Sequence, residues 1–229
     1  MIVHSANEVS RSTLAEQIYE HILGDILSGK ISAGSKLLTS HVANRFGTSL
    51  APVREAISRL TEEGLIETKP FVGSVIKEQT WNDLEEIFLM RQVLEVHAAK
   101  LIISQKLPKF DAQHPVRIAF ENLITAAKSR NKQQIIEADV EFHREICKLA
   151  KSPLTLEVWT TIMKRYRGAR LIFESHHPDS MKQIIENHQI LIDALESGNV
   201  KKAESEFCLH LSSAVEYLRP KALEVLNKK

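Results

Sequence analysis

Four polar side chains interrupt apolar helical stripes in the second half of the sequence, and together they could bind a metal ion. Asp139 and His143 are four residues apart on one stripe, so both should face the helical core. His188 lies on a second stripe and His210 on a third. Carboxylate oxygens and imidazole nitrogens are common ligands of divalent metals, and this set therefore predicts a metal site.

Each of these histidines taken singly has a simpler explanation. One histidine on an apolar face is more often a core side chain whose nitrogens are hydrogen-bonded. Burying a carboxylate beside three histidines without a counter-ion is costly, however. A divalent ion such as zinc, nickel or manganese would neutralise the carboxylate and use every imidazole, so metal binding becomes the better interpretation of the group.

A metal held in this way could also activate water, which makes a helical-bundle metalloenzyme with an Asp/His3 site the alternative function. Glu186 is near His188 in sequence and could serve as a base, but no His-Glu-x-x-His or comparable motif is present. A third class, a helical protein-interaction module with a structural metal, leaves the first third of the chain without a role.

Six helices are predicted to position these residues, and no convincing strand appears from Trp81 onward. Proline, glycine and polar clusters mark the breaks between them. Pro220 should end or kink the last helix at Arg219, with the tail through Lys229 a frayed helix. The helices should form an antiparallel bundle. The predicted ranges are 81–105, 115–129, 132–150, 153–174, 179–197 and 200–219.

The first third of the chain shows a different order of elements. A helix over about 13–29 begins with the capping-box pattern Thr-x-x-Glu. Thr39 should cap a short second helix and Ser49 a third. Strands at 65–69 and 74–77 follow as a hairpin. This order predicts a winged helix-turn-helix, whose third helix can enter the major groove of DNA.

Composition bounds the class of protein but gives no electrostatic signature of DNA binding. The 229 residues have a formal net charge of +1, and residues 1–77 hold eight Lys or Arg and eight acidic residues. A DNA-binding face must therefore arise from the placement of charges. The sequence has only two cysteines and no recognisable signal peptide, which predicts a cytoplasmic protein. It also has no apolar run of about 18 residues, so no membrane span is predicted. We expect a mainly α protein, with the winged helix-turn-helix over 10–78 and the all-helical bundle over 79–225.

The first third resembles the GntR family of transcription regulators. The resemblance covers about 17–77 and is carried by Ala-Pro-Val-Arg-Glu-Ala-Ile-Ser-Arg-Leu at 51–60, by Glu-Gly-Leu-Ile-Glu at 63–67 and by the wing glycine. It implies DNA contacts from the recognition helix and the wing. The residues implied to bind DNA are Thr39, Ser40, Ser49, Leu50, Ala51, Arg54 and Gly73.

Two departures from the family pattern bear on DNA recognition. Leu50-Ala51 stands where the family usually has Arg-Thr, and Ser40 where a second arginine is often found. Fewer cations on the DNA-facing side predict a smaller phosphate contribution and an operator different from the family's common one.

The second half resembles the FCD domain, the FadR-type C-terminal domain of one GntR subfamily, in its shorter six-helix version. The resemblance covers about 81–218 and rests on order and spacing. It implies that Asp139 and the three histidines bind a divalent metal and that an organic acid completes its coordination sphere. Arg91 is the candidate partner for the acid's carboxylate, and a salt bridge to Glu95 is the equally weighted alternative. The motifs are Arg91 with Glu95, Asp139 with Phe142-His143, Glu186-Asn187-His188, residues 194–199 and His210-Leu211.

Together the two resemblances imply a metal-dependent transcription regulator that responds to a small organic acid. It should bind double-stranded operator DNA as a homodimer, because paired recognition helices must match the half-site spacing. The resemblance favours a repressor that the effector releases from DNA. No residue of the sequence determines whether the protein represses or activates transcription.

Overall fold

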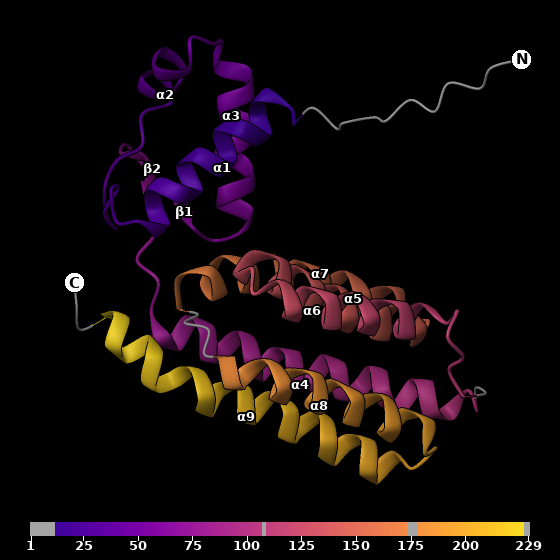
Figure 1. Cartoon of the computed structure of the whole chain (residues 1–229). Helices are drawn as coiled ribbons and strands as arrows, with labels where there is room; N and C mark the ends of the chain where they lie inside the picture. Colours follow the sequence, from indigo (N-terminus) through magenta and orange to yellow (C-terminus); the bar gives the residue numbers. More distant parts are fainter. Residues whose placement is uncertain (1–11, 107–108, 174–177, 227–229) are drawn as a thin grey trace, which may run out of the picture. The chain divides into compact units, whose positions relative to one another are not determined.

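A computed structural model describes residues 12–106, 109–173 and 178–226 of the chain (Figure 1). The chain divides between Glu78 and Gln79 into two compact units, and each is described by itself. The predicted domain start at residue 10, the predicted helix end at residue 174 and the tail at 227–229 lie outside the described residues.

The first unit consists of three helices followed by a two-stranded wing. β1 and β2 pair antiparallel, from Ile66 opposite Ile76 to Lys69 opposite Gly73. This order confirms the predicted winged helix-turn-helix. The elements are α1 (Leu14–Leu27), α2 (Thr39–Phe46), α3 (Leu50–Glu62), β1 (Ile66–Lys69) and β2 (Gly73–Ile76).

Local sequence signals explain most of the helix ends in this unit. Thr13 Oγ1 accepts a hydrogen bond from the N–H of Glu16, as the capping pattern predicts. The prediction that Thr39 caps α2 is wrong, because Thr39 is already helical and the capping position belongs to Leu38, whose side chain cannot accept. Ser49 does precede α3, but its hydroxyl makes no capping hydrogen bond to the described chain. Gly47 ends α2 in the left-handed conformation, at φ 59°.

A buried carboxylate ties α2 to α1. Asp25 on α1 accepts a hydrogen bond from Arg45 Nη1 at 2.8 Å and lies 3.1 Å from Lys30 Nζ. The hydrogen bond from Arg45 is the main reason that the pKa of Asp25 is lowered. This ion pair fixes the short α2 helix ahead of α3.

The second unit is an all-helical bundle in two layers, which confirms the predicted fold class. Figure 1 shows α5, α6 and α7 in one layer and α4, α8 and α9 in the other. Contacts of α4 with α6 and α7, and of α5 with α8, join the layers. Its elements are α4 (Trp81–Ser104), α5 (Pro115–Ser129), α6 (Lys132–Leu149), α7 (Pro153–Phe173), α8 (Pro178–Glu196) and α9 (Val200–Leu226).

The last helix is longer than predicted. α9 continues through Pro220 to Leu226, past the predicted boundary at 219, so of the two predicted effects of Pro220 an end of the helix at Arg219 is wrong. Pro220 lies in the last two turns of the helix, and its missing N–H removes one helical hydrogen bond, the one to the carbonyl of Glu216. No helix in the described ranges is long and apolar enough to cross a membrane.

Large apolar side chains fill the space between the two layers. Phe88, Phe142, Trp159 and Phe207 are all almost completely buried. The polar groups Arg91, Glu95, His143 and His188 are buried among them. Burial of so many polar groups requires that they be paired or bind an ion.

Candidate metal centre and DNA-binding elements

Three helices of the second unit bring the four predicted metal ligands together. Asp139 and His143 come from α6, His188 from α8 and His210 from α9. Ligand nitrogens of the three histidines lie within 4.8 Å of one another. His188 Nε2 is 3.0 Å from Asp139 Oδ1, and His210 Nε2 is 3.3 Å from His143 Nε2. The ligand nitrogens of the three histidines therefore converge, and Asp139 Oδ1 lies at the edge of this group, 3.0 Å from His188 Nε2 and 3.9 Å from His143 Nε2.

The hydrogen bond of His188 fixes its tautomer. His188 Nδ1 lies 2.7 Å from the carbonyl oxygen of Ile184, which can only accept, so Nδ1 carries a proton and donates it. In the neutral ring Nε2 then presents a lone pair to Asp139 Oδ1, which is also an acceptor. Two facing acceptors at 3.0 Å need a cation, either a proton or a metal ion, to be stable.

Glu95 orients His143 in a similar way. His143 Nδ1 is 2.7 Å from Glu95 Oε2, a short contact without the alignment of a hydrogen bond. The nearby carboxylate favours a proton on Nδ1, which leaves the Nε2 lone pair for the other ligands. Glu95 Oε1 accepts hydrogen bonds from Arg91 Nε at 2.8 Å and from Trp159 Nε1 at 2.9 Å. A carboxylate on the second ring nitrogen is typical of histidines that bind metals.

Glu95 makes more contacts than its sequence position predicts. From the sequence it is expected only as a partner of Arg91, one helical turn away. The bond from Trp159 spans 64 positions of the chain, and the contact with His143 joins α4 to α6. Neither has a local sequence signal, although an acidic residue on the buried face of α4 could have marked Glu95 as a partner for a core cation.

The protonation states of the cluster suit metal ligation. Burial lowers the pKa of His143, and burial together with His188 and His143 lowers the pKa of His210 further. Burial raises the pKa of Asp139, but the close His188 imidazole at 3.0 Å and the neighbouring His143 outweigh this when they carry positive charge, and they hold the pKa well below the ordinary value. These directions favour an ionised Asp139 and neutral imidazoles at His143 and His210, the states in which such groups bind metals.

A cavity of about 300 Å³ adjoins the cluster. Asp139, His188 and His210 line it, and so do Arg91 and Arg170. The predicted salt bridge from Arg91 to Glu95 is present, and the same guanidinium faces the cavity. Its Nη2 atom is buried without a hydrogen-bond partner among the described residues. Of the three arginines that the sequence places on α7, Arg170 is the one that lines this space.

The predicted DNA-binding residues lie at the ends of elements in the first unit. Thr39 and Ser40 begin α2, and Ser49 precedes α3. Leu50, Ala51 and Arg54 lie in the first two turns of α3 and are exposed, Leu50 to 41%. Gly73 begins β2 with φ 93°. These residues therefore come from the helix-turn-helix and from the wing.

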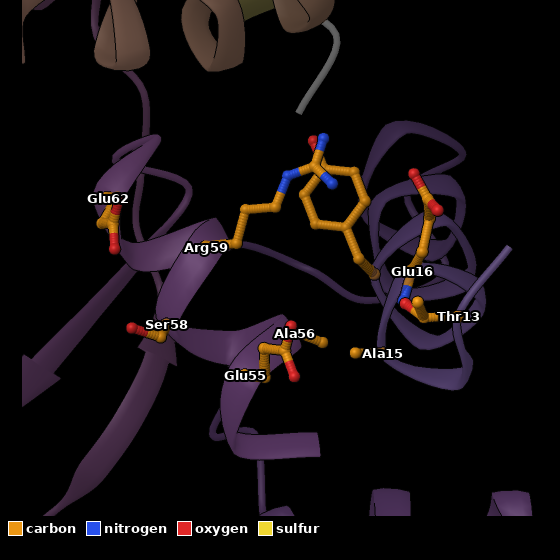
Figure 2. Close-up of a pocket in the computed structure, with 9 residues that line it drawn as sticks. Thr13, Ala15, Glu16, Glu55, Ala56, Ser58, Arg59 and Glu62 are labelled. Carbon is orange, nitrogen blue, oxygen red and sulfur yellow. The ribbon is translucent and has the colours of Figure 1, made fainter. Parts of the chain in front are cut away.

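A separate groove lies between α1 and α3 (Figure 2). Figure 2 shows the side chain of Arg59 reaching from α3 toward α1, and its guanidinium carbon lies 3.7 Å from the centre of the Tyr19 ring. The Tyr19 hydroxyl donates to Glu63 Oε2 at 2.7 Å. Burial and the charge of Glu63 raise the pKa of Tyr19. These contacts hold α1 against α3, so we assign the groove a structural role.

A winged helix-turn-helix followed by a helical bundle is the architecture of a two-domain transcription regulator. The family model described as "Bacterial regulatory proteins, gntR family" matches residues 14–76, and the model described as "FCD domain" matches residues 86–213. The chain belongs to the GntR family, in the branch that carries an FCD domain. Its relatives are transcription regulators and not enzymes, so the metalloenzyme hypothesis is not supported.

The regions that match in similar proteins extend over both units of this chain. The protein named "Probable D-xylose utilization operon transcriptional repressor" of Paenarthrobacter nicotinovorans is 26% identical over 209 residues, which cover 91% of this chain and 90% of the relative. The HTH-type transcriptional regulator McbR of Escherichia coli K12 is 26% identical over 199 residues, which cover 86% of this chain and 87% of McbR. A solved structure of E. coli McbR/YncC superposes on this chain with a TM-score of 0.66 at 22% sequence identity. The match covers 92% of this chain and 99% of the McbR/YncC chain, which shows a shared fold.

Proposed function

We propose that this regulator is a metal-dependent repressor that a small organic acid releases from its operator. The observation that carries the proposal is the pair of facing acceptors, His188 Nε2 and Asp139 Oδ1, at 3.0 Å beside an arginine-lined cavity. A cation resolves the conflict between the acceptors, and an anionic ligand in the cavity would approach that cation directly.

The residues present fit a divalent ion. Asp139, His143, His188 and His210 would hold it through one oxygen and three nitrogens, a donor set that suits zinc, nickel or manganese. When bound, the ion supplies a positive centre on which a carboxylate can dock. Glu95 keeps His143 in the ligating tautomer, and Tyr166 donates to Asp139 Oδ2 at 3.2 Å, which orients the carboxylate.

The cavity favours a small carboxylic acid as the effector. Arg91 and Arg170 place guanidinium groups on its wall, and arginine forks match carboxylates in a bidentate geometry. The buried, unpartnered Nη2 of Arg91 is a donor that a bound carboxylate would satisfy. A volume of about 300 Å³ is at the lower end for ligand sites, which favours a small acid.

DNA recognition belongs to the first unit. Arg54 would contact phosphate or a base edge from α3, and Ser49, Leu50 and Ala51 would face the major groove ahead of it. Thr39, Ser40 and Gly73 would approach the DNA backbone. The protein acts as a homodimer, because two recognition helices are needed to bind a two-fold operator.

An acid screen with paired arginine variants tests the effector site. The full-length protein is given zinc, nickel or manganese, and small mono- and dicarboxylic acids are tested for a rise in unfolding temperature. We expect at least one acid to stabilise the protein and to weaken its binding to operator DNA. In Arg170→Gln the acid should bind about tenfold more weakly, because a charge-assisted hydrogen bond is lost.

Arg165→Gln is the matched control, since Arg165 is an exposed arginine of the same helix and does not line the cavity. Its affinity for the acid should equal that of the wild type. Equal losses in both variants, or no stabilising acid in the presence of metal, would contradict the assignment of the cavity as an effector site.

A further inference from the structure

The tip of the wing holds a turn whose sequence does not suit its backbone. Pro70, Phe71 and Val72 connect β1 to β2, and the N–H of Val72 donates to the carbonyl of Lys69 at 3.2 Å. Phe71 has φ 63°. Proline in the second position and a positive φ in the third define a type II turn, in which the third position normally belongs to glycine or asparagine.

Phe71 is unfavourable in the free protein for two reasons. A bulky side chain in the left-handed region is a steric outlier, because its Cβ crowds the backbone. The ring is also fully exposed, at 109%, so it packs against nothing in the described part of the chain. A strained backbone and an unburied aromatic ring at one exposed position point to a binding role and not to a role in folding.

The surroundings of Phe71 fit nucleic acid as its partner. Val72 is 41% exposed and extends the apolar tip. Lys69 ends β1 and pairs with Glu67 on the same strand at 3.0 Å. The Lys36 side chain lies beside Gly73, where an added Cβ would be 3.9 Å from Lys36 Cε. An apolar tip with lysines at its base matches a groove whose floor is made of stacked bases and whose rims carry phosphates.

We propose that Phe71 is an apolar wedge that enters the minor groove of operator DNA and partly unstacks a base step. In a winged helix-turn-helix the recognition helix occupies the major groove, which leaves an adjacent minor groove to the wing. Phenylalanine is one of the residues that minor-groove proteins insert between bases. The wedge favours operators with a flexible pyrimidine–purine step at this place, so Phe71 is a specificity-determining residue.

The wedge also accounts for the weak electrostatics of the first unit. Residues 1–77 carry equal numbers of basic and acidic side chains, and α3 begins with the exposed, uncharged Leu50 and Ala51. An apolar contact at the wing adds affinity without releasing counterions. The affinity that Phe71 provides should therefore be independent of salt.

The test uses full-length protein and a duplex selected from a random-sequence library by the wild type. Phe71→Gly removes both the ring and the strain, and Phe71→Asn removes the ring but keeps a residue that tolerates the left-handed turn. Both should bind the duplex about tenfold more weakly or worse, with an unchanged slope of affinity against salt. Phe71→Leu, which keeps an apolar wedge, should retain most of the affinity.

Two further readouts separate a wedge from a structural role. The unfolding temperatures of Phe71→Gly and Phe71→Asn should equal or exceed that of the wild type, because no packed side chain is lost. With 2-aminopurine placed in turn at each position of the duplex, wild-type protein should increase the fluorescence at one step and Phe71→Asn should not. Wild-type affinity in both the Gly and the Asn variant, or an affinity loss that comes with a smaller salt slope, would overturn the proposal.

Discussion

Replacing His210 or Asp139 with alanine is expected to abolish the response to the effector while leaving operator binding in its absence within about twofold of the wild type. The proposed DNA contacts all lie before Glu78, and the proposed metal ligands all lie in the second unit. Removal of a ligand therefore deletes no DNA contact. An acid can shift the protein away from its DNA-binding state only through a difference in affinity for the two states, and loss of the metal removes that difference.

The measurement is fluorescence anisotropy of labelled operator, titrated with the acid found by thermal shift. In the wild type the acid should weaken operator affinity by about 5- to 150-fold, the usual range of allosteric coupling. In both variants the operator affinity without acid and the operator affinity with acid should be nearly equal. His97→Ala is the control, since His97 is an exposed histidine of α4 outside the cluster, and it should respond as the wild type does.

Replacing Glu95 with glutamine is expected to cost about 3–5 kcal/mol of the free energy of unfolding, because a buried arginine loses its counter-charge. Arg91 Nε and Trp159 Nε1 donate hydrogen bonds to one oxygen of the carboxylate, and His143 Nδ1 lies 2.7 Å from the other. An amide has one oxygen to accept with, and its NH2 group must face one of these donors. Denaturant unfolding measures the loss, and metal affinity should fall about 10- to 100-fold as well.

Glu204→Gln provides the comparison for this prediction. Glu204 also pairs with a cation, Lys100 Nζ at 2.8 Å, but both side chains are more than 40% exposed. The same substitution there should cost less than about 1 kcal/mol. Similar losses in the two variants would show that the buried network around Glu95 does not have the strength that its geometry implies.

Helical periodicity was sufficient to predict that four polar side chains come together in the bundle core, and metal binding by them stays a prediction. The apolar stripe of a helix faces the core, so a polar residue on that stripe must face the core as well. This holds for Asp139, His143, His188 and His210. Convergence of the three stripes then followed from packing the helices in one bundle. The resemblance to the FCD domain selected the same residues.

Contacts between distant helices could not be predicted in the same way. Glu95 contacts α6 and α7 as well as its own helix, and the Tyr166 hydrogen bond to Asp139 depends on how α7 packs against α6. Periodicity predicts which face of a helix is buried, but it does not predict which other helix packs against that face. The left-handed conformation of Phe71 was also missed, because proline and glycine marked a turn there without specifying which residue would take the positive φ.

The metal content of the purified protein tests the proposed sensing mechanism most directly. Full-length wild type prepared without chelator should contain about one divalent ion per chain by elemental analysis, and His210→Ala should contain much less. After chelation, adding zinc, nickel or manganese should raise the unfolding temperature of the wild type. A wild type that contains no metal and gains no stability from any of the three ions would show that the four residues form a polar cluster and that the proposed sensing mechanism is wrong.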